Sequence, residues 1–274
     1  MIPAVVRRRL RIARRVVFFT GAGMSSESGI PTFRDAMEGL WAKYDPTEVA
    51  SPKAFKANPQ LVWDWYCYRA EIIRTAKPNA GHRAIAQLAK TTKVTVITQN
   101  VDSLHQAAGS ENVLELHGNI FRLKPFLDED EAFANGKIPM LCPVCGGYAD
   151  PDRMDEYAYK EDFEVIQLVA GPVPSCPCCG TLLRPGVVWF GESLGHDVLN
   201  VAVASVEACD ALICVGSSME VAPASGLPLR ALERGAVVIE VNPHRTAFSA
   251  IASVSVSGKA AEVLPVLIGA GWFD

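Results

Sequence analysis

Four of the eight cysteines have the spacing of metal ligands. Cys142 and Cys145 form one Cys-x-x-Cys pair, and Cys176 and Cys179 form a second pair about thirty residues further on. Two such pairs supply the four thiolates that a tetrahedral zinc ion takes, and they leave no position for a reactive water. We therefore predict one structural Zn²⁺, with a redox-active pair as the alternative. Cys178 lies inside the second pair, but its spacing does not suit a ligand.

A glycine-rich turn, Gly21–Ala22–Gly23–Met24–Ser25, directly follows the apolar run Val16–Thr20. Glycines at such a turn let the backbone approach a pyrophosphate, whose charge is favoured by amides at a helix N-terminus. Ser26 stands where the usual third glycine would fall, so a tight turn without a ligand is the alternative. The continuation from Ser28 to Asp35 (SGIPTFRD) is not typical of Rossmann turns in general, and it makes the motif specific.

The polar string Gln99–Asn100–Val101–Asp102 follows a second apolar run, Val94–Thr98. Amide and carboxylate groups at the carboxyl end of a buried strand face the crevice where a cofactor binds, and they can bond an amide or ribose hydroxyls there. The alternative is that Asp102 only caps a following helix. Two adjacent amides are more than a cap needs, so we favour the binding interpretation.

His117, followed by Gly118, comes just after the run Val113–Leu116. An imidazole that titrates near neutrality is suited to taking a proton from a hydroxyl. A single histidine is more often structural than catalytic, and the chain has four others: His82, His105, His196 and His244. Two further turns, at Gly216–Ser217–Ser218 and at Asn242–Pro243, also follow apolar runs and could hold phosphates and a second ribose.

Short apolar runs alternate with helical patterns, as in a doubly wound parallel sheet that is buried on both faces. The runs are Val16–Thr20, Val94–Thr98, Val113–Leu116, Val187–Phe190, Ala211–Val215 and Val237–Val241, and the helical patterns span about 60–76, 80–90, 197–208, 224–234 and 260–268. We predict an α/β, Rossmann-like domain from residues 1–30, 80–120 and 185–274, with a helical and cofactor-loop insertion at 31–79 and a small zinc-binding module at 121–184.

The composition is that of a globular enzyme, with 274 residues, of which 49% are apolar and 20% charged. A net charge of −4 gives no general attraction to nucleic acid, and no stretch reaches the roughly 20 apolar residues of a membrane span. We expect neither as a partner, and we expect a monomer. Paired cysteines that ligate metal are typical of a reducing compartment, which favours the cytoplasm.

Six arginines and no acidic residue open the chain: Arg7, Arg8, Arg9, Arg11, Arg14 and Arg15. A transit peptide has this composition. However, Leu10 and Ile12 lead directly into the first apolar run, so we predict that the segment is the first helix of the fold.

The ordered set of motifs resembles the sirtuin signature from about residue 10 to the C-terminus. It comprises Gly21–Ala22–Gly23 through Phe33–Arg34–Asp35, Gln99–Asn100–Val101–Asp102, His117–Gly118, the four cysteines, Phe190–Gly191–Glu192, Gly216–Ser217–Ser218 and Val241–Asn242. The resemblance implies a Rossmann-type NAD⁺ domain with a zinc module, and an acylated lysine of a protein substrate that enters between them. It also implies transfer of the acyl group to NAD⁺, which gives free lysine, nicotinamide and O-acyl-ADP-ribose.

The resemblance also implies residue roles. His117 would be the general base on the nicotinamide ribose, with Asn100 and Asp102 at the nicotinamide end. The implied cofactor-binding residues are Gly21, Ala22, Gly23, Glu27, Thr32, Phe33, Arg34, Gln99, Asn100, Val101, Asp102, Gly216, Ser217, Ser218, Asn242, Pro243, His244 and Ala260. The implied substrate-binding residues are Tyr66, Arg69, Val188, Phe190, Gly191 and Glu192.

The acyl preference is suggested by Tyr66 and Arg69, which resemble the Tyr-x-x-Arg pair of the sirtuin branch that removes succinyl, malonyl and glutaryl groups. A buried guanidinium binds a carboxylate through two hydrogen bonds, and a phenol adds one more donor. Ala36 matches the small residue that widens the acyl pocket in that branch. We predict removal of both acetyl and acidic acyl groups; the alternative is that both residues only pack on an aromatic helix.

Two stretches, Leu123–Leu141 and Met154–Val173, make the zinc module longer than in the relatives that it resembles. The module is therefore enlarged, while its four cysteine ligands are retained. Two other functions remain as alternatives: a protein mono-ADP-ribosyltransferase with a sirtuin fold, and a non-catalytic zinc-ribbon protein that only binds partners.

Overall fold

The computed structural model describes residues 3–32, 44–126, 140–142, 148–149 and 168–273. The chain divides into two compact units. Unit 1 consists of Met1–Met37, Ile72–His117 and Ser193–Asp274, and unit 2 consists of Glu38–Glu71 and Gly118–Glu192. The predicted division into a sheet domain and two insertions stays a prediction.

Unit 1 contains a six-stranded parallel sheet with the order β10-β9-β8-β1-β2-β3. Its strands are β1 (Arg15–Thr20), β2 (Lys93–Thr98), β3 (Val113–Glu115), β8 (Ala211–Val215), β9 (Val237–Asn242) and β10 (Val254–Ser257). In β1, β2, β8 and β9 nearly every residue is buried, as expected of a parallel sheet with both faces covered. The predicted α/β fold class is therefore confirmed.

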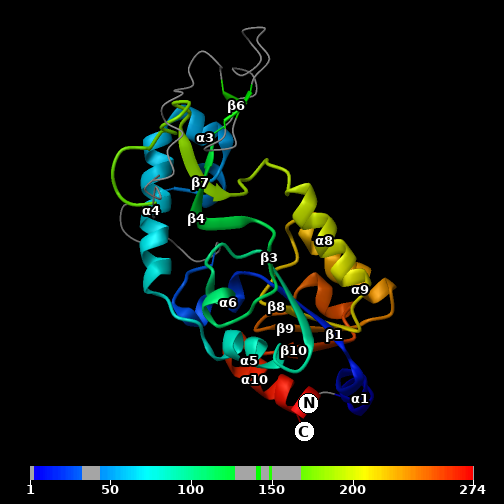
Figure 1. The fold of residues 1–274 in the computed structure, drawn as a ribbon. Helices are drawn as coiled ribbons and strands as arrows, with labels where there is room; N and C mark the ends of the chain where they lie inside the picture. Colours follow the sequence, from blue (N-terminus) through cyan, green and yellow to red (C-terminus); the bar gives the residue numbers. More distant parts are fainter. Residues whose placement is uncertain (1–2, 33–43, 127–139, 143–147, 150–167, 274) are drawn as a thin grey trace. The chain divides into compact units, whose positions relative to one another are not determined.

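Helices cover both faces of this sheet (Figure 1). On one face, α1 (Ala4–Ile12), α5 (Ala80–Leu88) and α10 (Ala260–Ile268) share a core with alternate strand residues such as Phe18 and Ile213. The elements α8 (His196–Glu207) and α9 (Leu227–Glu233) lie on the other side. The remaining short elements are α6 (Leu104–Ala107) and the single turns η1 (Ala22–Met24), η2 (Ser26–Ser28), η6 (Ala224–Gly226), η7 (Ala247–Ala250) and η8 (Gly269–Phe273).

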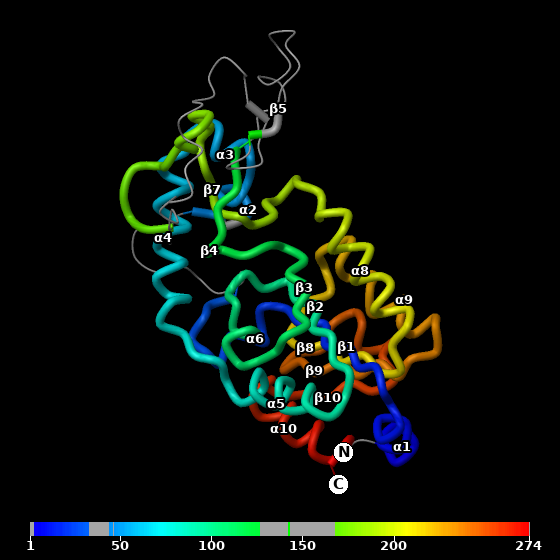
Figure 2. The backbone as a smooth tube through the Cα atoms, in the orientation of Figure 1, coloured from blue at the N-terminus to red at the C-terminus, as the bar shows by residue number. Residues whose placement is uncertain are grey.

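The arginine-rich opening forms α1, as predicted, because Val6 and Leu10 bury one side of the helix while the arginines remain on the other. Gly271 of η8 packs against Leu10, and the traces of α1 and the chain's last turn lie side by side in Figure 2. No helix in the described ranges is long and apolar enough to cross a membrane.

Unit 2 is built from helices and two small antiparallel sheets. The helices are α2 (Pro46–Val49), α3 (Pro52–Ala57) and most of α4 (Pro59–Thr75), whose residues from Ile72 onward belong to unit 1. One sheet pairs β4 (Gly118–Pro125) with β7 (Leu183–Val187), and the other pairs β5 (Met140–Leu141) with β6 (Tyr148–Ala149). Phe55, Phe126 and Trp189 pack their rings together in the interior.

Two expectations about strands need correction. The run Val187–Phe190 is not a strand of the parallel sheet: β7 ends at Val187 and pairs antiparallel with β4 in unit 2. An unbroken apolar run shows burial, but it does not show which partner the strand takes. We also missed β10, whose alternation of valine and serine is typical of a half-exposed edge strand.

Candidate active site

The carboxyl ends of β1 and β8 are the point where the strand order reverses. From β1 the chain moves outward through β2 to β3, and from β8 it moves in the opposite direction through β9 to β10. In open α/β sheets the ligand crevice lies at such a switch point. The two glycine-containing turns, at Gly21–Gly23 and at Gly216, follow these two strands.

These two turns contact each other through their backbone atoms. The Gly21 amide donates to the Val215 carbonyl and the Gly23 amide to the Gly216 carbonyl, each at 2.9 Å. A Cβ atom on Gly216 would lie 2.5 Å from the carbonyl carbon of Gly23, and Gly216 has a φ of +58°. A Cβ on Gly21 would come within 2.8 Å of the Gly216 carbonyl oxygen. The glycines therefore allow the two turns to meet in direct backbone contact at the switch point.

Replacing Gly216 with alanine should destabilise the fold by about 2–4 kcal/mol, because the new methyl group collides with backbone and the residue must keep a left-handed conformation. Urea unfolding measures the change. Gly235→Ala is the matched control, because Gly235 also has a positive φ (+84°) but has open space around its Cα. Equal losses of stability in both variants would show that the contact between the turns is unimportant.

Ser217 links the ends of three strands. Its hydroxyl accepts a hydrogen bond from Nε2 of Gln99 at 3.0 Å, and its carbonyl accepts one from Nδ2 of Asn242 at 2.9 Å. Gln99 follows β2, and Asn242 is the last residue of β9. Thus the structure brings together side chains that the sequence placed at separate strand ends.

Asn100, Asp102 and Ser25 form a second connected group. The Ser25 hydroxyl donates to Oδ2 of Asp102 at 2.6 Å, and Nδ2 of Asn100 lies 3.1 Å from both the Ser25 hydroxyl and the Gly21 carbonyl. Oδ1 of Asp102 accepts from the Leu104 amide, so the carboxylate also has the capping role that we considered as an alternative. Burial raises the pKa of Asp102, although the bonds from Ser25 and Leu104 oppose the shift.

His117 is held in one orientation by the backbone. Its Nδ1 lies 3.0 Å from the carbonyl oxygen of Gln99, which can only accept, so Nδ1 carries the proton and Nε2 has the free lone pair. Burial lowers the pKa of His117 below its ordinary value of 6.5, while the bond to Gln99 opposes the change. The neutral ring is therefore the dominant form at neutral pH.

The competing histidines are poorly placed for proton transfer. His82 and His105 have almost no exposed surface, and burial lowers the pKa of His82 to about 4 and that of His105 to about 3. His196 and His244 are exposed on the surface. His117 alone among the five combines partial exposure with a fixed tautomer at a strand end.

The other predicted cofactor residues lie in several separate segments of the chain. Glu27 and Ala260 lie at the N-terminus of α10, where Oε2 of Glu27 accepts from the Ala261 amide at 2.7 Å. Pro243 and His244 are exposed just after β9. The rest that are described, Ala22, Thr32, Val101 and Ser218, are half-buried, and Phe33 and Arg34 fall outside the described residues, as does Ala36.

The predicted acyl-binding pair lies on α4 in unit 2. Tyr66 and Arg69 are 4% and 8% exposed, and the Arg69 guanidinium lies 5.0 Å from the centre of the Trp65 ring. Burial raises the pKa of Tyr66 well above its ordinary range, although the neighbouring Arg69 opposes the shift, so the phenol remains a hydrogen-bond donor. The pair is buried rather than solvated, which sets it apart from charged residues on a helix surface.

The segment with the predicted substrate residues follows β7. Val188 is half-buried, Phe190 and Gly191 are exposed, and the Phe190 amide donates to the Ala50 carbonyl. The Glu192 carboxylate accepts from the Trp189 amide at 2.8 Å and pairs with Arg184, whose guanidinium stacks on the Trp189 ring. These carboxylate contacts are within the chain, so Glu192 shapes the segment.

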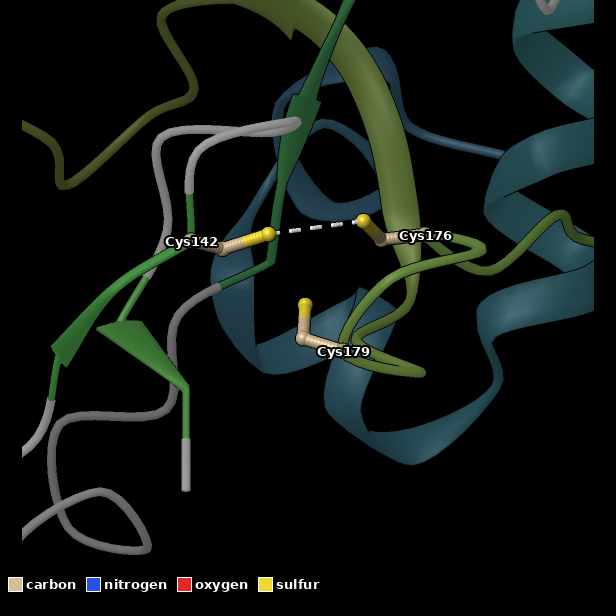
Figure 3. A group of neighbouring side chains, drawn as sticks. All are labelled: Cys142, Cys176 and Cys179. Carbon is tan, nitrogen blue, oxygen red and sulfur yellow. Dashed lines mark hydrogen bonds between the residues drawn. The ribbon is translucent and has the colours of Figure 1, made fainter. Parts of the chain in front are cut away.

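Three of the four predicted metal ligands converge in unit 2 (Figure 3). The sulfur atoms of Cys142, Cys176 and Cys179 lie within 4.8 Å of one another, all three residues are buried, and none forms a disulfide. The Sγ atoms of Cys142 and Cys176 are 3.8 Å apart. Two sulfur ligands of a tetrahedral zinc ion, with Zn–S bonds of about 2.3 Å, have about the same separation. Gly180 adopts a φ of +72°, which allows the tight turn after the second pair. The cluster indicates a metal site; Cys145 lies outside the described residues.

Sequence reasoning missed several residues that support these sites. Ser25 was inside the first motif but was given no role, although it links Asn100 to Asp102. Arg184 could have been recognised from the sequence, because an arginine within the otherwise uncharged segment Leu182–Val187 needs an acidic partner if the segment is buried. Asn79 could have been recognised only as a helix cap.

Comparison with known proteins identifies the family. The sequence model of the Sir2 family matches residues 21–223. A curated NAD-dependent protein deacylase of Pyrococcus furiosus is 44% identical over 264 residues, covering 96% of this chain and 95% of the relative. NAD-dependent protein deacylase 1 of Pseudomonas aeruginosa is 43% identical, covering 93% of this chain and 94% of its own.

Solved structures agree with this assignment. A crystal structure of a Sir2 homologue in complex with NAD has a TM-score of 0.79 at 39% identity, covering 98% of this chain and 93% of that chain. A Sir2 variant bound to a deacetylated p53 peptide and 3′-O-acetyl-ADP-ribose has a TM-score of 0.74 at 30% identity, covering 99% of both chains. The chain therefore belongs to the Sir2 family of NAD-dependent protein deacylases.

Proposed function

We propose that this deacylase acts with His117 as the general base on the ribose of NAD⁺. The proposal rests on the hydrogen bond from Nδ1 of His117 to the Gln99 carbonyl, which leaves Nε2 free to accept a proton. A base is most useful when it is unprotonated at the working pH, and burial favours this form. The products are free lysine, nicotinamide and O-acyl-ADP-ribose, and the partner is an acylated lysine of a protein, as the peptide complex of the Sir2 relative supports.

The strand ends around the switch point supply the rest of the dinucleotide site. Gly21, Gly23 and Gly216 suit a site for the pyrophosphate because they carry no side chain that would keep the phosphates away from the strand ends. Asn100 and Asp102 act at the nicotinamide end, and Ser217, Asn242 and their neighbours act at the adenosine end. The NAD complex of a Sir2 homologue supports this use of the fold.

The cysteine cluster holds one Zn²⁺ with a structural role. Cys142, Cys176 and Cys179 supply three thiolates, and Cys145, three residues after Cys142, completes the tetrahedral set. The ion stabilises the fold of a region with little apolar core, and all four positions are filled by protein. It therefore has no part in bond breaking.

Tyr66 and Arg69 extend the substrate range to acidic acyl groups, so that succinyl and malonyl lysines are used as well as acetyl lysine. The supporting observation is a guanidinium that is 8% exposed on an aromatic helix beside a protonated phenol. Burial lowers the pKa of Arg69, which reflects the cost of removing its charge from water, while Tyr66 opposes the shift. A carboxylate on the acyl chain would offset that cost through two parallel hydrogen bonds.

Replacing Arg69 with methionine should lower kcat/KM for a succinylated peptide about a hundredfold, since a charged hydrogen bond of about 1.5–3 kcal/mol is lost. The rate on the acetylated form of the same peptide should change only a few-fold, because methionine keeps most of the packing volume. Steady-state rates on the two peptides measure the ratio. Arg74→Met, later on the same helix, is the control and should not alter it. Equal losses on both peptides would mean that Arg69 only packs.

The ADP-ribosyltransferase alternative predicts a different product from the same cofactor chemistry. Mass spectrometry of a reaction with NAD⁺ and an acylated protein separates the two functions. Deacylated lysine with O-acyl-ADP-ribose supports the proposal, whereas ADP-ribosylated protein without deacylation would overturn it.

A further inference from the structure

The turn from Met24 to Ser28 is held by the side chain of Asn79, the residue that caps the N-terminus of α5. Nδ2 of Asn79 donates to the Met24 carbonyl at 2.8 Å and to the Ser28 hydroxyl at 3.1 Å. Its Oδ1 accepts from the amides of Gly81 at 2.9 Å and His82 at 3.3 Å, at the start of the helix. Asn79 is 8% exposed, so its amide group joins a helix N-terminus to the glycine turn inside the protein.

A second anchor holds the same turn from α10. Oε2 of Glu27 accepts from the Ala261 amide at 2.7 Å, in the first turn of that helix. The three segments also pack closely: a Cβ atom on Gly81 would lie 3.0 Å from the Ala260 carbonyl oxygen and 3.1 Å from the end of the Met24 side chain. The turn is therefore fixed to two helices on the same face of the sheet.

The residue between these anchors is Ser25, which joins the two polar groups of the proposed nicotinamide end. Its hydroxyl donates to Asp102 at 2.6 Å and accepts from Asn100 at 3.1 Å. The Met24 carbonyl belongs to the peptide bond that leads into Ser25. A shift of that carbonyl therefore moves the Ser25 hydroxyl away from both partners.

We infer that Asn79 is a positioning residue for the NAD⁺ site, which it sets by holding the Met24 carbonyl and thereby the Ser25–Asp102–Asn100 group. This inference rests on the proposed roles of Asn100 and Asp102. Met24 is fully buried, so loss of the Asn79 donor leaves its carbonyl unpaired unless the turn moves. Asn79 does not act on the substrate itself.

The substitution Asn79→Asp separates the two tasks of this side chain. Aspartate caps a helix as well as asparagine does, so the bonds from Gly81 and His82 persist. It cannot donate, so the contact with the Met24 carbonyl becomes one between two acceptors, while the Ser28 hydroxyl can still donate to the new carboxylate. We expect the KM for NAD⁺ to rise about tenfold, with a corresponding loss in directly measured NAD⁺ binding. The KM for the acylated peptide should change by less than about twofold, because the proposed acyl-binding residues belong to the other unit.

Asn58→Asp is the matched control. Asn58 also caps a helix, by accepting from the Leu61 amide at 3.1 Å, and the same chemical change there removes no donor to the glycine turn. Its KM for NAD⁺ should equal that of the unmodified enzyme. An Asn79→Asp enzyme that folds and binds NAD⁺ normally would overturn the inference, and so would equal changes in the NAD⁺ and peptide constants.

Should Asn79→Asp fail to fold, Asn79→Ser gives the decision, since serine also caps a helix but lacks the amide group that donates to the Met24 carbonyl. A rise of about threefold in the KM for NAD⁺ supports the inference, and an unchanged value overturns it. Failure of this inference is distinguishable from failure of the proposed function. If the proposed function is wrong, His117→Ala retains its deacylation rate, whatever the Asn79 variants show.

Discussion

Replacing His117 with alanine should reduce kcat/KM for deacylation about a thousandfold, because general-base catalysis by a positioned side chain is worth about 10²–10⁴ in rate. The fold should persist, since among the described residues the side chain of His117 makes one hydrogen bond, that from Nδ1 to the Gln99 carbonyl. Steady-state deacylation and circular dichroism measure the two quantities. His196→Ala, which removes an exposed imidazole at the start of α8, is the control and should keep full activity.

The pH dependence gives an independent check on the same residue. The neutral imidazole is the active form, and burial disfavours the imidazolium, so the folded pKa lies below 6.5. The midpoint of the decline in activity at low pH should therefore lie below pH 6.5. A decline centred above pH 6.5 would contradict the geometry, and substantial deacylation by His117→Ala would remove His117 from its role.

Replacing Cys142 with serine should abolish zinc binding and unfold the part of unit 2 around the cysteines. Zinc contributes on the order of 10–16 kcal/mol to the folding of comparable small modules. Cys142, Cys176, Cys178 and Cys179 form only a small apolar cluster with Leu183 and Leu123, which cannot replace that contribution. Metal analysis should find about one zinc per unmodified chain and none in the variant. Limited proteolysis should then cut unit 2 first.

Cys209→Ser is the matched control for this experiment. Cys209 is also buried, but it lies in unit 1 and donates to the Val206 carbonyl, a bond that serine can keep. The control should retain its zinc and its resistance to protease. Unchanged zinc content in Cys142→Ser would contradict the assignment of this ligand.

Much of the fold could be predicted because the sheet is buried on both faces. β1, β2, β8 and β9 appear in the sequence as unbroken apolar runs for this reason. The prediction that Val187–Phe190 belongs to the parallel sheet was wrong, because an apolar run does not indicate whether the neighbouring strand is parallel or antiparallel. The same logic also failed for β10, where one face of the strand is exposed and the apolar residues alternate with serine.

The positions of polar residues at strand ends were also predictable, but their hydrogen-bond partners were not. Glu27 stays a predicted cofactor residue, and the bond that its carboxylate accepts from the first turn of α10 could not be foreseen. Glu192 stays a predicted substrate residue, and its bonds with Arg184 and the Trp189 amide could not be foreseen either. Short polar side chains choose partners by three-dimensional proximity, and Asn79 and Met24 are 55 positions apart in the chain. Sequence spacing contains no information about such pairs.

The backbone contact between Gly216 and the turn at Gly21 and Gly23 limits how the specificity of this protein for dinucleotides could be changed. A side chain on either turn would displace the other turn, because backbone atoms of the opposite turn occupy the position that a Cβ atom would take. Attempts to redirect the enzyme toward altered dinucleotides would therefore fail at these three positions. They are better aimed at Pro243 and His244, the exposed neighbours of Asn242 at the proposed adenosine end, where a larger or charged side chain leaves the core of the sheet packed.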